Sequence, residues 1–250
     1  PRVEGMFHRS VSFIHENMEP DYVRYLSAEL QRGMRYKCLF STGYIGDFMW
    51  QLADHHLRMM YGLSKEVYGY GWWNLYYDRI FCYGDHDYRR LNIFDTCVKV
   101  GNPKLDSFFR DKHGLQIQAI RRFELDRGKR TLLYAPTYGT LSSIDHWVDS
   151  IDRLQDDYNV IVKLHHRTSY IEKQRKNAIG TRLKNVVDDR YDPQELWSVC
   201  DVLLSDNSGI VYEGILVDAD IVILETSISG QDRLLTNENS LDQTIKQWIT

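Results

Sequence analysis

The clearest chemical pattern in this 250-residue chain lies in the stretch 201–213. A short apolar run, 202–204, is followed by the turn-forming residues 205–209 (Ser-Asp-Asn-Ser-Gly) and then by apolar residues at helical spacing. This order predicts a strand covered on both faces, a tight turn and a helix. Backbone N–H groups at the start of a helix lack partners and attract anions. We therefore predict that Ser208 and Gly209 hold a phosphate; the alternative is an ordinary strand-to-helix turn capped by Ser or Asp.

Two histidines follow another apolar run, in the sequence Lys163-Leu-His-His166. An imidazole at the end of a strand can hydrogen-bond a phosphate or give a proton to a leaving group. Its alternative role is to cap the next helix or pair with an aspartate. Beside a phosphate-binding turn we favour the functional role for His165. We expect His166 to point to the other face, as a structural or exposed residue.

These residues can meet only if the elements before them form one parallel sheet. The second half of the chain alternates apolar runs with helix-like segments, which is typical of a parallel sheet with crossover connections. Ligands bind beyond the carboxyl ends of such strands, and polar residues including Thr137, His165, Ser205 and Asp206 follow these ends. The expected strands are 131–135, 159–164, 185–187, 202–204 and 220–224, and the expected helices are 144–155, 169–180, 193–200, one from 210, and 240–249.

A weaker alternation precedes this block. The expected strands are 37–41, 57–61, 79–83 and 96–100, and the expected helices are 21–31, 45–55 and 85–92, with a charged helix at 105–126. The chain is thus predicted to be α/β and GT-B-like, with two Rossmann-like parallel-sheet domains facing a cleft, at 1–104 and 105–250. Because the chain begins at Pro1 without a methionine, we expect the N-terminal domain to be truncated.

Composition excludes several classes of function. A formal net charge of -4 provides no basic field for nucleic acid, and no apolar run approaches the roughly 20 residues of a membrane span. The four cysteines, at 38, 82, 97 and 200, are scattered, which favours buried, reduced thiols in a cytosolic protein over a zinc site.

Two further patterns are ambiguous. The sequence Asp54-His-His56 imitates a phosphoesterase metal motif, but the matching carboxylates are absent and we expect it at a helix end, with no metal. The aromatic loop that begins at Gly69 (Gly-Tyr-Gly-Trp-Trp) could stack on a base or sugar, or simply pack in the core.

Four segments together resemble the CDP-glycerol glycerophosphotransferase family, the polymerases and primases of teichoic acid and capsule polymers. They are Val100-Gly-Asn-Pro-Lys-Leu-Asp106, Leu133-Tyr-Ala-Pro-Thr137, Val162-Lys-Leu-His165 and the stretch 201–209. The resemblance implies a GT-B fold that needs no cofactor. The C-terminal domain would hold a CDP-linked alditol and the N-terminal domain would serve the acceptor. An acceptor hydroxyl would then attack the phosphate next to glycerol, and CMP would leave.

Carried over by position, the resemblance assigns roles to single residues. His165 would contact or protonate the diphosphate. The residues that would cradle the diphosphate or lie nearby are Thr137, Ser205, Asp206, Ser208 and Gly209. The acceptor would be a polymer or lipid-linked hydroxyl. The enzyme would act in the cytoplasm, with peripheral contact at the inner face of the membrane through segments outside this chain.

The chain departs from the family pattern at two points. Where the family has a His-Gly whose histidine is the proposed base, this chain has Tyr61-Gly62. A neutral tyrosine is a poor base, although Lys65 remains available for phosphate contact. The base could instead be His55, His56 or His86, or the chain could be a degenerate member that binds a nucleotide or polymer as a regulator.

The second departure is at Glu213, which gives the turn a Ser-Gly-x-x-x-Glu form. This form is similar to nucleotide-sugar epimerases and retaining glycosyltransferases, whose glutamate binds a ribose or sugar hydroxyl. A nucleotide-sugar donor therefore stays open as an alternative.

Overall fold

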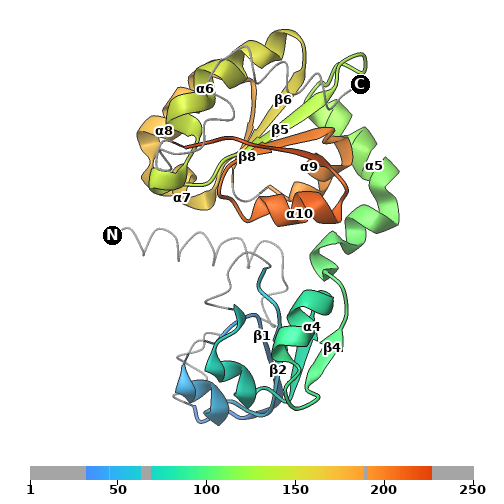
Figure 1. Cartoon of the computed structure of the whole chain (residues 1–250), viewed down its shortest axis with the longest axis vertical. Coiled ribbons are helices and arrows are strands. Elements are labelled where there is room, and N and C mark those ends of the chain that lie inside the picture. The colour runs from blue at the N-terminus through green and yellow to red at the C-terminus, as the bar shows by residue number, and fades with distance from the viewer. Residues whose placement is uncertain (1–31, 45, 63–68, 189–190, 227–250) are drawn as a thin grey trace. The chain divides into compact units, whose positions relative to one another are not determined.

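A computed structural model of the chain describes residues 32–44, 46–62, 69–188 and 191–226. The chain divides between Pro103 and Lys104 into two compact units, each built on one parallel sheet (Figure 1). The helices predicted at 21–31 and 240–249 and the side chain of Lys65 lie outside the described residues.

The first unit contains a four-stranded parallel sheet in the order β1-β2-β3-β4. Its elements are β1 (Tyr36–Ser41), the 3₁₀ helix η2 (Asp47–Gln51), β2 (Ala53–Met59), the 3₁₀ helix η3 (Trp72–Tyr76), β3 (Arg79–Cys82), α4 (Asp85–Leu91) and β4 (Cys97–Lys99). One small buried cluster lies beside β3, and it includes Met60, Ile80 and Leu91.

The helix predicted at 45–55 is wrong. Only the single 3₁₀ turn of η2 forms there, and β2 begins at Ala53, four residues before the expected strand. Asp54-His-His56 therefore lies within a strand and not at a helix end. Its polar residues hid the strand from the sequence pattern, since a charged residue is rarely expected inside a sheet. Arg58 is nevertheless buried there, and its guanidinium donates a hydrogen bond to the Gly69 carbonyl at 2.9 Å.

The cysteines follow the prediction with one exception. All four are free, Cys82 and Cys97 are buried, and Cys200 is partly buried. Cys38, on the edge strand β1, is exposed.

The second unit contains a five-stranded parallel sheet in the order β7-β6-β5-β8-β9. All five predicted strands form, with bounds that differ by at most one residue. The strands are β5 (Thr131–Ala135), β6 (Asn159–Lys163), β7 (Asn185–Val187), β8 (Val202–Ser205) and β9 (Asp220–Ile223). The helices are η4 (Pro103–Leu105), α5 (Asp106–Arg122), η5 (Gly139–Leu141), α6 (Ile144–Arg153), η6 (Leu154–Asp156), α7 (His166–Ile171), α8 (Lys173–Arg182), α9 (Pro193–Val199) and α10 (Ile210–Leu216).

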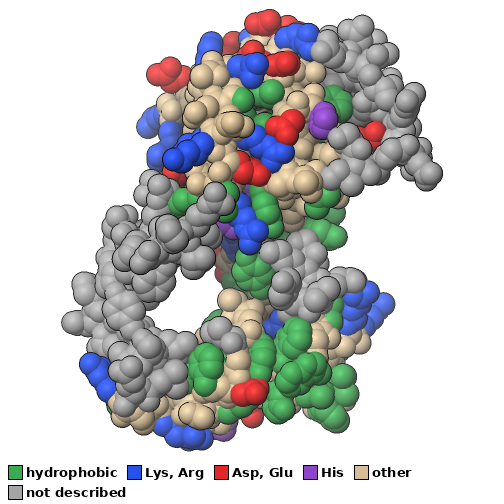
Figure 2. Space-filling view, turned by 90° about the vertical axis from the view of Figure 1, so that its left-hand side faces the viewer, with side chains coloured by type: hydrophobic (Ala, Val, Ile, Leu, Met, Phe, Trp, Pro, Cys, Tyr) green, Lys and Arg blue, Asp and Glu red, His purple; other side chains and the backbone are tan. Residues whose placement is uncertain are grey.

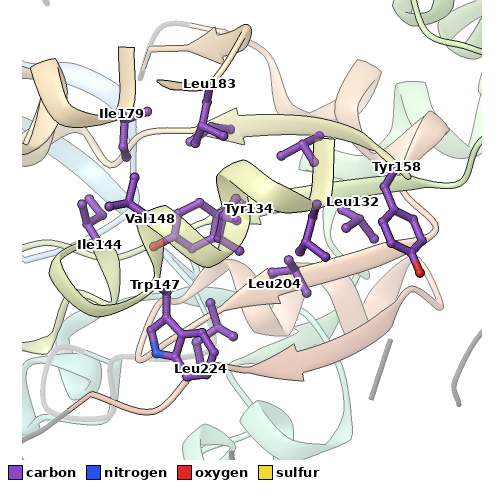
Figure 3. Packing of buried hydrophobic residues seen from close by; sticks show 14 of the residues in the cluster. Leu132, Tyr134, Ile144, Trp147, Val148, Tyr158, Ile179, Leu183, Leu204 and Leu224 are labelled. Atoms are coloured by element: carbon purple, nitrogen blue, oxygen red, sulfur yellow. The ribbon is translucent and has the colours of Figure 1, made fainter. Parts of the chain in front are cut away.

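Alternate side chains of this sheet fill two separate cores. Leu132 and Tyr134 of β5 point into one cluster with Ile144 and Trp147 of α6 (Figure 3). Leu133, the residue between them, points into the other cluster, which α5, α9 and α10 cover. The period of two along each strand thus places α6 and α8 on one face and α5, α9 and α10 on the other (Figure 1).

The strand order reverses direction at β5 in this sheet. The chain builds β5, β6 and β7 in one direction and then returns to the other side of β5 to form β8 and β9. The loops after β5 and β8 therefore leave the sheet in opposite directions. In doubly wound folds such a switch point is where ligands bind.

Candidate functional site

Asp206 links the carboxyl ends of β5 and β8. One carboxylate oxygen accepts a hydrogen bond from the Thr137 backbone N–H at 2.8 Å. The other accepts from the backbone N–H and the hydroxyl of Ser143, both at 2.8 Å. The side chain after β8 thereby fixes both ends of the loop after β5.

Asp206 is buried and has a structural role in the site. Burial raises the pKa of its carboxyl group, and the hydrogen bonds from Ser143 and Thr137 oppose that rise. Ser205 beside it is also fully buried, and its hydroxyl donates to the Ala135 carbonyl at 2.7 Å. The side chains of these two residues therefore hold the backbone after β5, and Thr137 is also nearly buried, at 7% exposure.

Ser208 and Gly209 continue from Asp206 toward solvent. Ser208 is half-buried and Gly209 is exposed. Gly209 occupies the N-cap position of α10, and no side chain caps that helix end. The turn therefore presents backbone N–H groups at the carboxyl edge, as the anion-binding interpretation requires.

His165 lies at the same edge, directly after β6. It is the N-cap of α7, and its Nδ1 accepts a hydrogen bond from the Arg167 backbone N–H at 3.2 Å. A neutral imidazole that accepts at Nδ1 carries its proton at Nε2. Nδ1 thus caps the helix, as the alternative role predicted. Nε2 carries the proton that a hydrogen bond to a phosphate oxygen needs.

An aromatic cluster surrounds His165. Its ring centre lies 4.6 Å from that of Tyr138 and 4.1 Å from that of His166. The prediction that His166 points to the other face is wrong, because β6 ends at Lys163 and His166 already belongs to α7.

Arg167 completes this cluster and was not predicted. Its guanidinium carbon lies 4.7 Å from the ring centre of Tyr138, in cation–π contact, and the residue is exposed. The cluster of Tyr138, His165, His166 and Arg167 brings a guanidinium and two imidazoles to the same edge of the sheet. Only the contact with Tyr138, 29 positions away in sequence, identifies Arg167 as part of the site.

Arg175 holds the loop that carries Tyr138. It forms two hydrogen bonds with Asp145, at 3.0 and 2.5 Å, and also donates to Glu172 at 2.7 Å and to the Gly139 carbonyl at 2.8 Å. Glu172 in turn accepts from the Gly139 N–H at 2.8 Å. The Arg175 guanidinium lowers the pKa of Asp145, and this ionised network fixes the backbone next to Tyr138.

Glu213 lies on α10, one helical turn after Gly209. One carboxylate oxygen accepts from Lys104 Nζ at 2.5 Å, which ties α10 to η4, the turn before α5. The other oxygen is buried and has no hydrogen-bond partner among the described residues.

The first unit carries the remaining predicted residues. Tyr61 follows β2 and is 64% exposed. A cavity of about 460 Å³ lies beyond the carboxyl end of β1, and apolar and aromatic side chains including Leu39, Phe40 and Tyr44 line it. Within the described ranges, histidine, cysteine and acidic side chains form no group of three that could hold a metal ion. In the same ranges, no helix is long and apolar enough to cross a bilayer.

Comparison with known proteins settles the family. Residues 88–227, more than half of the chain, match the family model described as CDP-glycerol:poly(glycerophosphate) glycerophosphotransferase. The chain belongs to this glycerophosphotransferase family. The match spans β4 to β9 and includes the whole carboxyl edge described above. No curated protein sequence is similar enough to count as a relative.

Solved structures show the fold of this family member. It resembles the wall teichoic acid polymerase TagF, in an H444N variant soaked with CDPG, with a TM-score of 0.59 and 14% identity over 84% of this chain and 62% of that one. It also resembles the UDP-GlcNAc 2-epimerase from Neisseria meningitidis bound to UDP-GlcNAc, with a TM-score of 0.52 and 16% identity over 85% and 67% of the two chains. The predicted α/β, GT-B-like fold is confirmed. The chain spans about half to two thirds of the TagF chains it matches.

Proposed function

We propose that the protein transfers glycerol phosphate, or another alditol phosphate, from a CDP-linked donor to a hydroxyl of a polymer or lipid-linked acceptor. Membership of the family supports the class of reaction. The observation that carries the proposal is the cluster of His165, Tyr138 and Arg167 at the carboxyl edge, where Asp206 joins the loops after β5 and β8. An imidazole donor, a fixed guanidinium and outward N–H groups at one sheet edge are what a diphosphate requires.

The donor diphosphate would be held from two sides. His165 Nε2–H and Arg167 would donate to phosphate oxygens from the β6 side. The N–H groups of Ser208 and Gly209 would donate from the β8 side, with Thr137 beneath them. Asp206 and Ser205 would act as positioning residues because their polar atoms already bind the loop after β5 and β5 itself.

The reaction breaks one phosphoanhydride bond. The acceptor oxygen bonds to the phosphorus that carries glycerol, and the bridging oxygen leaves with the bonding electron pair as part of CMP. Negative charge therefore builds up on CMP, next to His165 and Arg167. Donors fixed at that point stabilise the transition state more than the ground state.

Glu213 favours a second candidate, a nucleotide-sugar glycosyltransferase or epimerase. Its buried carboxylate oxygen, which lacks a partner among the described residues, could accept a hydrogen bond from a ribose or sugar hydroxyl. The same hydrogen bond would serve the ribose of a cytidine nucleotide, so Glu213 alone does not separate the two donors.

A panel of donors separates the candidate functions. The full chain is incubated with CDP-glycerol, UDP-GlcNAc and other UDP-sugars, and CMP, UDP and epimerised sugar are measured. We expect CMP from CDP-glycerol. Release of UDP or an epimerised sugar would establish the second candidate, and absence of turnover with every donor would favour a nucleotide- or polymer-binding regulator. A Tyr61→His variant that gains activity would show that a base is limiting at that position.

Substitution of His165 tests the site itself. Loss of one hydrogen bond to a charged phosphate costs about 1.5–3 kcal/mol, so His165→Ala should lower kcat/KM for CDP-glycerol about 10- to 100-fold. His113→Ala, at an exposed histidine of α5, is the matched control and should match the parent. Equal kcat/KM values in His165→Ala and the parent would show that the diphosphate site is misplaced.

A further inference from the structure

We propose that Tyr138 is a positioning residue for the transfer reaction, because its ring holds the His165 imidazole and the Arg167 guanidinium in place for the donor diphosphate. This inference rests on the proposed function, which sets these two groups against the phosphates. A group that must meet a phosphate oxygen works best when neighbouring contacts lock its rotamer before the substrate binds.

One aromatic ring contacts both groups. The ring centre of Tyr138 lies 4.6 Å from that of His165, with an angle of 31° between the two planes. The Arg167 guanidinium carbon lies 4.7 Å from the same ring centre. Tyr138 follows β5, whereas His165 and Arg167 stand at the start of α7, after β6. The ring is therefore a support that comes from a different loop than the two groups it holds.

The imidazole of His165 needs this second contact. Its Nδ1 accepts from the Arg167 backbone N–H at 3.2 Å, which is the long end of the usual range for such a hydrogen bond. A single hydrogen bond leaves the ring free to tilt about it, and tilting changes the direction of the Nε2–H. The Tyr138 ring packs against the imidazole and limits that tilt. The two contacts together set where the Nε2–H points.

The guanidinium of Arg167 also depends on the ring. Arg167 is exposed, and an exposed arginine side chain samples many rotamers, which binding to a phosphate must restrict. The cation–π contact with Tyr138 restricts them in advance. The donor then has less ordering to impose when it binds, and this strengthens its binding.

The backbone on both sides of Tyr138 is tied to the rest of the second unit. The Thr137 N–H donates to the buried carboxylate of Asp206 at 2.8 Å. The Gly139 N–H donates to the Glu172 carboxylate, also at 2.8 Å. The Tyr138 side chain itself is half-buried. A ring held in this way can act as a fixed support for the two groups that pack on it.

Removal of the ring tests this role in the full chain. CMP release is measured with CDP-glycerol and a short oligo(glycerol phosphate) acceptor, and circular dichroism confirms that each variant is folded. Tyr138→Leu and Tyr138→Gln each lose both ring contacts and should lower kcat/KM for CDP-glycerol about 5- to 50-fold. Tyr138→Phe keeps the ring without the hydroxyl and should restore kcat/KM to within about threefold of the parent.

A combined variant separates positioning from a general loss of structure. If Tyr138 acts through His165 and Arg167, its effect should disappear when both are removed. In a His165→Ala/Arg167→Met background, adding Tyr138→Leu should lower kcat/KM less than about twofold. Tyr158→Leu is the matched control, because Tyr158 is buried just before β6, at the opposite edge of the same sheet. It should keep the kcat/KM of the parent.

The outcomes separate this inference from the proposed function. A parent that releases no CMP would overturn both together. A parent that turns over while Tyr138→Leu and Tyr138→Gln keep its kcat/KM would overturn the inference alone. Tyr138→Phe as impaired as Tyr138→Leu would also overturn it, since the hydroxyl and not the ring would then be at work. An undiminished effect of Tyr138→Leu in the His165→Ala/Arg167→Met background would do the same.

Discussion

Asp206 illustrates how a residue typical of a ligand-binding turn can serve the chain itself. Its carboxylate accepts three hydrogen bonds from Thr137 and Ser143, and its side chain is nearly inaccessible to solvent. An aspartate after a strand does favour a functional edge of a sheet. Here it sets the path of the loop after β5, which contains Tyr138, and therefore the position of the ring on which His165 and Arg167 pack.

We predict that Asp206→Asn destabilises the protein. Both carboxylate oxygens accept from backbone N–H groups, so an amide must direct its NH₂ donor at one of them. A buried donor left without an acceptor costs about 1–3 kcal/mol, which urea denaturation would report as a lower midpoint. Asp218→Asn is the matched control because Asp218 is exposed at a φ of 59°, which asparagine tolerates. Equal midpoints for the Asp206→Asn variant and the parent would contradict the structural role.

The contacts of single residues show where sequence reasoning stops. His165 was predicted at the site because a histidine directly after an apolar strand is a local signal. Arg167 and Tyr138 carry no such signal, because an exposed arginine and a tyrosine in a turn occur in many proteins. They become a site only through a contact between the loops after β5 and β6, which depends on the Arg175 network.

At the scale of elements, apolar runs in the sequence located the buried strands well, but a strand with many polar residues was missed. The five strands of the second sheet are covered on both faces, so hydrophobic residues mark each one. β2 carries Asp54, His55 and Arg58, and its pattern resembled a helix. The predicted helix 169–180 forms as α7 and α8, which meet at Glu172, whose side chain binds Thr168 and Arg175.

The packing of α10 on the sheet depends on Gly214. A Cβ atom there would lie 3.0 Å from Leu203 Cδ2 and 3.2 Å from Ile221 Cδ1, closer than normal van der Waals contact. Leu203 is fully buried on β8, which has neighbours on both sides, so it has little room to move. The glycine therefore fixes how closely the helix after the Ser208–Gly209 turn approaches the sheet.

We predict that Gly214→Ala lowers the free energy of unfolding by about 1 kcal/mol. Overpacking of a buried contact costs about 1–3 kcal/mol, and the helix propensity of alanine returns at most about 1 kcal/mol of it. Gly180→Ala is the control, since Gly180 lies in α8 with open space around its Cα. The Gly180→Ala variant should gain about 0.5–1 kcal/mol in free energy of unfolding from helix propensity alone. If thermal unfolding shows both variants stabilised alike, α10 has room that the structure does not show.

At the scale of the whole molecule, the hydrophobic cores are confined to single units. The two clusters of the second sheet use residues from Leu105 to Leu224, and the cluster of the first sheet uses residues from Met60 to Cys97. None of these three clusters crosses the boundary between Pro103 and Lys104. The first unit also exposes many of its large apolar side chains, whereas charged side chains of both signs cover the second unit (Figure 2).

Separate cores predict separate unfolding. Calorimetry of the full chain should show two transitions, with the second unit melting at the higher temperature because it has the larger buried core. CDP-glycerol at about 100 times its dissociation constant should stabilise the unit that binds it by roughly 2.7 kcal/mol, and we expect only the upper transition to move. Glycerol 3-phosphate, which lacks the nucleotide, should leave both transitions in place. Movement of the lower transition alone would place the donor on the first sheet and contradict the site at His165.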